Sequence, residues 1–399
     1  VVAVSDITAV NYGGRLESFF NIGGQNITAG IDLENIWKNG QRTKNFILQP
    51  NLPLKIEDLW KQARIINAGF YSSWNQQLGK FDLTFSARLD FNSARSNPLM
   101  LKKMNGDVLY ENVNTASNYT NVSFSGGLLW DIKENWGLGL TLGRGVRSPD
   151  LTERYIILLP VGYDRYDYLG NPGLKPEANH QADLKIYYEN EKTGYFEANT
   201  FFSYVTNYIT AQLVPESYVQ KQTQDVLGVK EFYNEDRVYL YGFEFSYASP
   251  VWGKFGMTAS GAVTIGINPD ATKYIIESGQ VTGEEKIGRD ALPEIPPFES
   301  NIDFIYKIIE NKLQTKASVR MVAAQEHVSD AFYEEATPGF VLADLSVNYT
   351  YSKNLRVNAG VNNIFDKAYY EHLNRRIIGS MQPLYEPGRL FFVNLILNI

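Results

Sequence analysis

The sequence predicts an all-β fold, a transmembrane antiparallel β-barrel. Apolar and polar residues alternate with a period of two along most of the chain, and the connections between these segments are alternately short and long. No apolar run reaches the ~20 residues that a membrane-spanning helix needs. Aromatic residues make up 14% of the 399 residues, with 26 Tyr and 22 Phe, which fits aromatic girdles at two lipid interfaces.

The alternation is clearest in residues 80–91. Phe81 and Phe85 point to one face of the predicted strand, while Asp82 and Arg88 point to the other. Many segments exceed the ~5–6 residues of a globular strand and match the ~9–11 residues of a tilted membrane-spanning strand. Fifteen segments show this period: 5–23, 25–37, 62–76, 79–93, 119–132, 135–147, 181–191, 194–210, 230–249, 253–267, 297–309, 312–325, 339–351, 354–365 and 388–399.

Short and long connections alternate along the chain, as in outer-membrane barrels with tight periplasmic turns and extended outer loops. Long connections are predicted at 38–61, 94–118, 148–180, 211–229, 268–296, 326–338 and 366–387. If the last strand runs inward, every long loop lies outside. Because fifteen is odd and open edges in lipid are costly, we expect at least one strand before Val1.

A large soluble β-sandwich or propeller is the alternative fold, since its strands also alternate. The polar face here carries both signs of charge on strand after strand, as in a wet lumen, which favours the membrane barrel. The absence of Cys excludes disulfides and thiolate metal sites. The net charge of −7 argues against a nucleic-acid partner, and we expect no cofactor.

Three stretches resemble TonB-dependent receptors. Residues 143–155, GRGVRSPDLTERY, include Arg147 and Pro149 and resemble the family's R-x-P signature at the top of a mid-barrel strand. Residues 170–177, GNPGLKPE, include Asn171 and Pro172 and resemble its GNPxLKPE element. We expect Pro149 to end a strand, since it has no N–H to donate, and Asn171 and Pro172 to form a turn.

The third stretch, residues 361–370, reads VNNIFDKAYY and resembles the family's NLFDKxY element before the last outer loop. It includes Asn363, Phe365 and Asp366, and the sequence EPGR then opens the final strand. We expect Asn363 and Asp366 to bond local backbone where the sheet breaks up. The motif residues therefore have predicted structural roles and are not assigned to ligand binding.

The resemblance covers essentially the whole chain. It implies that residues 1–399 are the C-terminal portion of a receptor barrel, strands eight to twenty-two of a 22-stranded barrel, without the plug domain and first strands. It further implies a place in the lipid of a Gram-negative outer membrane and active import of a scarce nutrient. The expected cargo is a chelated metal, such as a ferric siderophore or copper, and the expected partner is the TonB–ExbB–ExbD energy-coupling complex.

The sequence predicts that the protein is not an enzyme. It has three His without zinc-hydrolase spacing, no G-x-S-x-G elbow and no Gly-rich phosphate loop in a strand–helix context. An outer-membrane protease or lipase built on His327 with Glu326 and Asp330 is the enzyme alternative, against which a solvated loop histidine is favoured. A scaffold or anchor barrel in a surface complex and a passive porin are the other alternative functions.

The segment after Arg147 holds candidate ligand-binding side chains. Tyr and Arg can bind a flat, anionic ferric siderophore by stacking and charge-assisted hydrogen bonds. The alternative is that these aromatic residues lie at the outer bilayer interface. The candidate ligand-binding residues are Arg154, Tyr155, Tyr163, Arg165, Tyr166, Tyr168 and, further along the chain, His372.

The metal is not identified by the sequence. Residues 148–170 contain no His, which argues against haem import as known in this family. The motif pattern resembles both copper receptors and iron-siderophore receptors. His327, His372, Met321 and Met381 are possible copper ligands, although the alternation places Met321 on the lipid face. Iron and copper both stay open at this point.

Overall fold

A computed structural model describes residues 2–49, 51–103, 105–159, 166–223, 226–277, 280–374 and 382–398. The main sheet has eighteen strands, and β5 and β6 form a separate hairpin. The strands are β1 (Val2–Ile22), β2 (Gln25–Asn45), β3 (Lys55–Leu78), β4 (Phe81–Arg95), β5 (Leu99–Lys102), β6 (Val108–Asn112), β7 (Ser117–Lys133), β8 (Trp136–Arg147), β9 (Ile157–Leu159), β10 (Asp167–Leu169), β11 (Glu177–Asn190), β12 (Gly194–Val214), β13 (Val229–Ala248), β14 (Phe255–Glu277), β15 (Gln280–Ala291), β16 (Glu299–Ile309), β17 (Leu313–Val322), β18 (Phe340–Thr350), β19 (Leu355–Asn362) and β20 (Leu390–Leu397), and one short helix is α1 (Leu151–Tyr155).

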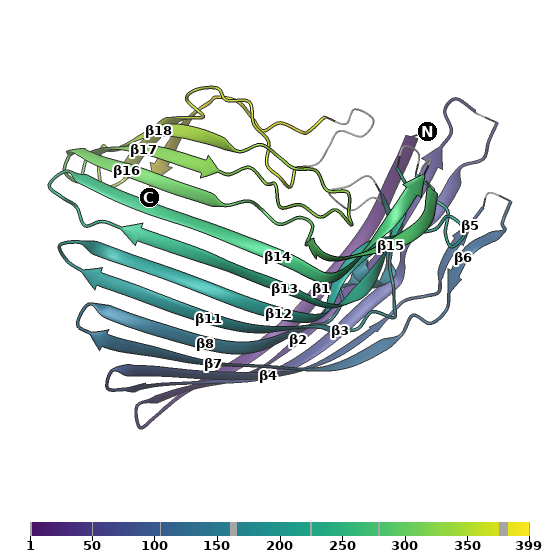
Figure 1. Cartoon of the computed structure of the whole chain (residues 1–399), viewed down its shortest axis with the longest axis horizontal. Coiled ribbons are helices and arrows are strands. Elements are labelled where there is room, and N and C mark those ends of the chain that lie inside the picture. The colour runs from purple at the N-terminus through teal and green to yellow at the C-terminus, as the bar shows by residue number, and fades with distance from the viewer. Residues whose placement is uncertain are drawn as a thin grey trace.

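The long strands form one curved antiparallel sheet in which each pairs with the next along the chain (Figure 1). The strand β14 pairs with β15 in its outer half and with β16 in its inner half, so β15 and β16 share one position in the sheet. The short β9 and β10 belong to a connection, and β10 pairs in parallel with β13. All fifteen predicted segments are strands, which confirms the all-β antiparallel fold class.

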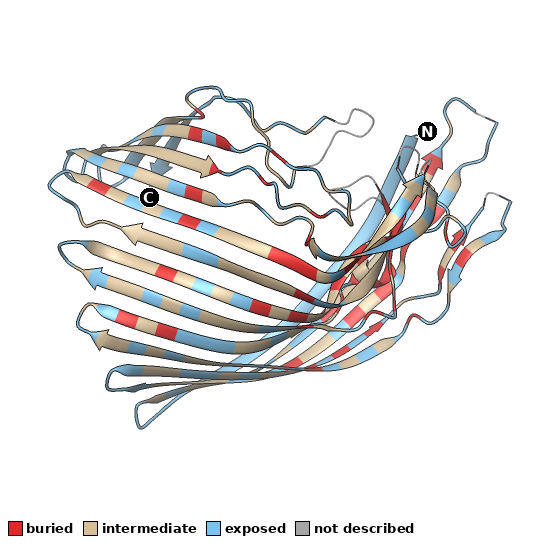
Figure 2. Cartoon of the chain, viewed as in Figure 1, coloured by how far each residue is buried: buried red, intermediate tan, exposed pale blue. Residues whose placement is uncertain are grey.

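Tight turns lie at one end of the sheet and long connections at the other, which we call the outer end (Figure 1). This alternation confirms the predicted pattern of connections. Among the described residues, β1 pairs only with β2 and β20 only with β19, so the sheet curves without closing. The whole of β1 is exposed, as its pale blue colour in Figure 2 shows.

Two of the predicted long loops are largely strand, which corrects the sequence analysis. In the predicted connection 38–61, β2 runs on to Asn45 and β3 begins at Lys55. In the predicted connection 268–296, β14 and β15 extend the sheet as a hairpin. The polar run 38–45 shows no alternation, but its backbone pairs with β1 on one side and β3 on the other.

The two faces of the sheet differ in the way that the alternation predicts. On β4, Phe85 is 54% exposed on the outer surface of the sheet, while Arg88 on the opposite face bonds Asp32 and Asp90 at 2.8 and 2.6 Å. Apolar side chains such as Leu142, Phe202 and others on neighbouring strands are likewise exposed. An exposed apolar surface of this extent belongs in lipid, and the charged inner face belongs in water.

The largest buried apolar cluster lies at the outer end, where connections fold against the sheet. It joins Leu59 and Trp60 of β3 to Tyr155 of α1, Ile157 of β9 and Leu169 of β10. The connections therefore have a packed core of their own, which gives them defined positions. Within the part of the chain that the structure describes, no helix has the length and apolar character needed to cross a membrane.

Candidate functional site

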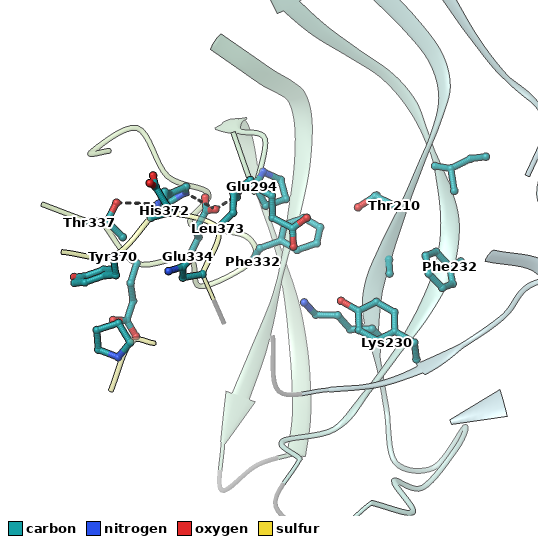
Figure 3. Close-up of a pocket in the computed structure, with 18 of the residues that line it drawn as sticks. Thr210, Lys230, Phe232, Glu294, Phe332, Glu334, Thr337, Tyr370, His372 and Leu373 are labelled. Atoms are coloured by element: carbon teal, nitrogen blue, oxygen red, sulfur yellow. Dashed lines mark hydrogen bonds and ion pairs between the residues drawn. The ribbon is translucent and has the colours of Figure 1, made fainter. Parts of the chain in front are cut away.

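A cavity of about 320 Å³ lies between the outer ends of β12 and β13 and the connections that follow β15, β17 and β19 (Figure 3). We call it the outer-loop pocket. It brings together segments that are far apart in the sequence, as ligand sites on loops held by a rigid scaffold commonly do. Its lining residues are Tyr168, Tyr208, Ile209, Thr210, Ala211, Lys230, Phe232, Pro293, Glu294, Phe332, Glu334, Glu335, Thr337, Tyr370, Glu371, His372, Leu373, Asn374 and Pro383.

One wall of the outer-loop pocket is built by β10 and β13. The parallel register places Tyr168 opposite Lys230. The side-chain amide of Asn171 donates to the backbone carbonyl of Phe232 at 3.0 Å, which holds the segment after β10 against β13. Backbone pairing and one partly buried side-chain bond thus fix Tyr168 beside the cavity.

The opposite wall is held together by Glu334 (Figure 3). One carboxylate oxygen contacts Nε2 of His372 at 3.1 Å and accepts the backbone N–H of Glu294 at 2.7 Å. The other oxygen accepts the backbone N–H of Ser329 at 2.9 Å, and Nδ1 of His372 lies 3.0 Å from Oγ1 of Thr337. Three outer connections therefore meet at one carboxylate.

The electrostatics of this wall keep Glu334 ionised. Burial acts to raise the pKa of Glu334, but hydrogen bonds from His372 and from the backbone N–H groups of Glu294 and Ser329 outweigh it and hold the pKa below its usual value. A carboxylate that accepts several N–H bonds is more stable in its charged form. Glu334 is thus a fixed negative charge on the pocket wall.

A second ionic group lies beside the outer-loop pocket. Arg320 on β17 bonds Glu371, which lines the pocket, at 2.6 Å and Glu299 on β16 at 2.7 Å. One guanidinium thus forms ion pairs with two carboxylates, and it connects the segment after β19 to the sheet. The guanidinium carbon also lies 5.5 Å from the ring centroid of Phe340, whose ring packs against Tyr369.

Lys230 lies in an aromatic surrounding at the edge of the pocket. Its ammonium nitrogen is 4.5 Å from the ring centroid of Tyr166, 5.4 Å from that of Phe332 and 6.0 Å from that of Tyr168. Ring faces at these distances attract a cation through their negative π surface. Rings from two different connections thus surround one cationic side chain.

The structure brings two of the predicted ligand-binding residues to the outer-loop pocket, Tyr168 and His372. Tyr166 lies next to it and contacts Lys230. Tyr163 and Arg165 fall outside the described residues. The roles of these side chains in ligand binding stay predictions.

Arg154 and Tyr155 lie elsewhere and are fully buried. The guanidinium of Arg154 donates to Asn92 and Ser117 at 3.0 and 3.2 Å and lies over the ring of Tyr119, and burial lowers its pKa. The hydroxyl of Tyr155 donates to the backbone carbonyl of Thr115 at 2.8 Å. Both side chains of α1 are thus packed inside the protein, outside the lining of the outer-loop pocket.

The first two motifs are joined by ion pairs around Arg147. Its guanidinium bonds Glu153 in α1 at 2.9 Å and Glu177 at the start of β11 at 3.0 Å. Pro149 follows the end of β8, and Asp150 caps α1 with bonds from the backbone N–H of Thr152 and Glu153. The motif thus fixes where β8 ends and how the next connection begins.

The turn residues of the other motifs bond local backbone. Asn171 accepts the N–H of Gly173 at 2.9 Å, and Pro172 is buried in the same turn. Asn363, at a φ of 51°, exchanges two bonds of 2.9 Å with the backbone of Lys367. Asp366 accepts the N–H of Arg389 at 2.9 Å, while Phe365 is 77% exposed. Asn and Asp favour such left-handed positions because their side chains bond nearby backbone.

The residues of the enzyme alternative do not form a catalytic pair in the described chain. Asp330 bonds Lys273 at 2.6 Å, and the side chains of His327 and Glu326 are exposed. No group of three His, Asp or Glu side chains in the described ranges is placed to hold a metal ion. Met321 pairs across strands with Ser300 and Val341, and Met381 lies outside the described residues.

Sequence reasoning missed several residues of the outer-loop pocket, among them Lys230, Phe332, Glu334 and Glu371. Each lies in or beside a predicted connection and has no local pattern of its own. Their shared feature is spatial, since they meet only after β12, β13, β17 and β19 are placed in the sheet. The Tyr-rich composition near Tyr168 was the one available signal for this region.

The family described as TonB dependent receptor-like, beta-barrel matches residues 4–364. In sequence, the chain is similar to the ferric enterobactin receptor of Pseudomonas aeruginosa, with 25% identity over 312 residues that cover 67% of this chain and 39% of that receptor. The match to residues 4–364 confirms the resemblance given by the three motifs.

Solved structures of low sequence identity share the fold. The copper transporter OprC has a TM-score of 0.78 and 20% identity, with 99% of this chain and 57% of that chain covered. The siderophore receptor PiuA from Acinetobacter baumannii has a TM-score of 0.71 and 15% identity, with 98% and 56% covered. The chain therefore spans little more than half the length of these two proteins.

Proposed function

Because the chain belongs to the TonB dependent receptor-like β-barrel family, we propose that it forms part of a receptor that actively imports a chelated metal. Receptors of this family lie in the outer membrane of Gram-negative bacteria, and they are transporters and not enzymes. The exposed apolar face of the sheet agrees with this location.

The outer-loop pocket is the observation that carries the proposal for ligand capture. It lies at the end of the sheet where the long connections gather, and it combines aromatic rings with charged side chains. Sites of this kind bind a flat chelate by stacking and orient it by a few polar contacts. We propose that Tyr168 and His372 contact the cargo there.

Two cargoes are supported by similarity. A relative named as a ferric enterobactin receptor supports a ferric siderophore, and a solved structure named as a copper transporter supports copper. We propose that import of either cargo uses the TonB–ExbB–ExbD complex, as the family membership suggests. A scaffold role or passive diffusion would not need this complex.

We also propose that residues 1–399 correspond to the C-terminal portion of a receptor barrel, strands eight to twenty-two of 22. The chain covers 57% and 56% of two solved structures, which agrees with its being a portion of a longer receptor. The intact mass of the native polypeptide extracted from outer membranes tests it. A mass well above 45.2 kDa is expected, whereas a mass near 45.2 kDa would contradict the proposal.

The import function is tested by uptake in cells. Cells with and without the native receptor gene are supplied with radioactive iron as siderophore chelates or with radioactive copper. We expect receptor-dependent accumulation of one metal that stops when the proton motive force is collapsed. Receptor-dependent metal entry that continues after the proton motive force is collapsed would indicate a porin. Equal entry in both strains would contradict the proposed import function.

A further inference from the structure

Two polar side chains lie on the apolar outer surface of the sheet, on the neighbouring strands β8 and β11. On β8, Leu140 and Leu142 are 44% and 55% exposed on that surface, and Arg144 faces the same side because side chains alternate along a strand. The register pairs Arg144 with Phe124 of β7, which is 54% exposed, and with His180 of β11. Arg144 and His180 thus face the side of the sheet that contacts lipid.

These two side chains lie near the outer boundary of the apolar band. At the inner end of the same strands Trp136 pairs with Tyr188, and their ring centroids are 4.7 Å apart. Arg144 lies eight residues further along β8 (136 to 144), and it pairs with His180. At about 3.3 Å per residue and a tilt of about 40°, this advance covers roughly 20 Å of the bilayer normal, against about 25 Å for the apolar band of such a barrel. The long side chain of Arg144 reaches from there to the headgroups.

A row of rings continues this boundary across the next two strands. The register places His180 opposite Tyr204 of β12, and Tyr204 opposite Tyr239 of β13. The ring centroids of His180 and Tyr204 are 6.0 Å apart, and those of Tyr204 and Tyr239 are 5.5 Å apart. Rings with one polar end are enriched where lipid meets water. We call Arg144, His180, Tyr204 and Tyr239 the outer polar row.

The charge of Arg144 is not balanced by the described part of the chain. Its guanidinium donates to the backbone carbonyl of Val122, which is a neutral acceptor, and no carboxylate of the described residues forms an ion pair with it. By contrast, Arg237 on β13 is paired with Asp270 at 2.9 Å. A guanidinium has five N–H donors and binds phosphate through two parallel hydrogen bonds. Arg144 therefore has donors and charge for an anion at the edge of the bilayer.

The surface beside Arg144 favours a lipid over a free anion. On the inner side of the outer polar row, Leu140, Leu142 and Leu184 are exposed and form part of the apolar band. An amphiphile can place its acyl chains on these side chains and its headgroup at the row, whereas a free anion makes no use of them. The order of apolar and charged contacts along β8 is thus the order in which a lipid presents its two parts.

We propose that the outer polar row holds the phosphate group of an anionic membrane lipid. Arg144 donates to the phosphate oxygens, and the rings of His180 and Tyr204 flank the headgroup. The acyl chains lie along the exposed leucines of β8 and β11. This proposal concerns the outer surface of the sheet and goes beyond import, because it requires a place in the membrane but no particular cargo.

The test uses the native, full-length receptor purified from outer membranes and delipidated in a neutral detergent. Phosphatidylglycerol has an anionic headgroup and phosphatidylcholine a zwitterionic one. Each is added separately, and native mass spectrometry measures the dissociation constant of the first lipid bound. We expect phosphatidylglycerol to bind about fivefold more tightly, the factor typical of one basic side chain near an anionic headgroup. Excess inorganic phosphate should not displace it, because the free anion lacks acyl chains.

Variants separate the charge contact from damage to the fold. Arg144→Gln should weaken phosphatidylglycerol binding about fivefold, and Arg144→Lys should weaken it less, because an ammonium group keeps the charge but loses the paired donors. Arg356→Gln removes an exposed arginine beside the tight turn before β19, far from the outer polar row, and should leave both lipids unchanged. A damaged fold would weaken both lipids together, whereas loss of the charge contact weakens phosphatidylglycerol alone.

The proposal is overturned if the two lipids bind with equal affinity, or if Arg144→Gln leaves the preference for phosphatidylglycerol intact. Displacement of the lipid by inorganic phosphate would make the row a site for the free anion and reject the lipid. A receptor dimer that is lost in Arg144→Gln would assign the row to contact with a second copy of the chain. None of these outcomes depends on uptake of a metal, so failure of the import function is recognised separately.

Discussion

At the residue scale, Glu334 joins several connections of the outer-loop pocket through a single carboxylate. Its two oxygens serve His372, Glu294 and Ser329, and these partners come from three different connections. A buried carboxylate that loses its charge leaves donors without acceptors, which costs more than the bonds themselves contribute. The order of three loops therefore depends on one ionised group.

Replacing Glu334 by Gln should loosen this junction. The amide keeps one acceptor oxygen but loses the charge-assisted bond to His372, which is expected to cost about 1–3 kcal/mol of local opening free energy. Hydrogen exchange of the segment 323–339 in the native receptor measures this change. Glu326→Gln places the same substitution at an exposed site of the same segment and should have no effect. Equal exchange in both variants would contradict the role of Glu334.

The same carboxylate predicts a pH dependence. Because the folded-state pKa of Glu334 lies below its ordinary value of 4.5, ionised Glu334 stabilises the junction above pH 4.5. This stability is lost as the pH falls through the lowered folded-state pKa. The other titratable groups that share the junction or pocket are His372, Lys230 and the carboxylates of Glu294, Glu335 and Glu371.

Limited proteolysis of the segment 323–339 from pH 7 down to pH 3 measures this transition. Wild type should become sensitive to cleavage only below about pH 4.5. Glu334→Gln should be sensitive at all pH values and show a smaller pH step. A transition of unchanged size in the variant would assign the pH dependence to another group.

At the element scale, the five-residue α1 is defined by its cap. Asp150 accepts the backbone N–H of Thr152 and Glu153, and the carboxylate of Glu153 accepts the N–H of Asp150. This reciprocal capping box satisfies donors that a helix of one turn cannot satisfy internally. The cap also positions the buried Arg154 and places Tyr155 in the buried apolar cluster at the outer end.

Asp150→Ala should therefore expose α1 to solvent. Loss of the cap is expected to cost about 1 kcal/mol, and amide hydrogens of residues 151–156 should exchange faster in the native receptor. Asp150→Asn is the matched control, since Asn caps a helix about as well as Asp. If Ala and Asn have the same effect, the charge of Asp150 and not its capping oxygen is what stabilises α1.

The elements also show how far sequence reasoning reaches. Strands were predictable where one face contacts lipid and the other contacts water. That difference requires apolar and polar residues to alternate, as Phe81 and Asp82 do. The outer halves of β2 and β14 were missed because they pair by backbone without such a difference. Residues 268–270 begin a segment that was predicted as a long connection, but the structure places them in β14, where the register with β15 shifts.

The site was less predictable than the fold. Tyr168 and His372 were identified by residue type and place in a connection, whereas Glu334 and Lys230 became visible only through their partners. Apart from Ser329, the partners named for Glu334 and Lys230 lie on segments more than thirty residues away, and no local pattern encodes such a distance. Arg154 shows the converse, since residue type alone indicates a ligand contact but the structure buries it.

At the scale of the whole molecule, the sheet separates two environments, and successive side chains along a strand face them in turn. Neighbouring residues Phe85 and Ser86 on β4 lie on opposite faces: Phe85 is exposed on the apolar outer surface, and Ser86 lines an inner cavity with Arg88 and Ser125. If the outer surface is in lipid, a charge at these two positions must have very different costs, although the positions are adjacent in the chain.

Phe85→Lys should destabilise the membrane-inserted receptor by up to about 2–4 kcal/mol, because the ammonium group would lie in hydrocarbon. Ser86→Lys should cost much less, since its ammonium group reaches the wet inner face, where Asp82 and Asp90 occupy the same side of β4. Urea unfolding of the native receptor reconstituted in vesicles measures both variants under the same conditions. In a water-soluble sheet with the opposite burial the order would reverse, because Phe85→Lys would be placed in solvent and Ser86→Lys in a core. The sign of this difference therefore tests the membrane assignment of the entire sheet.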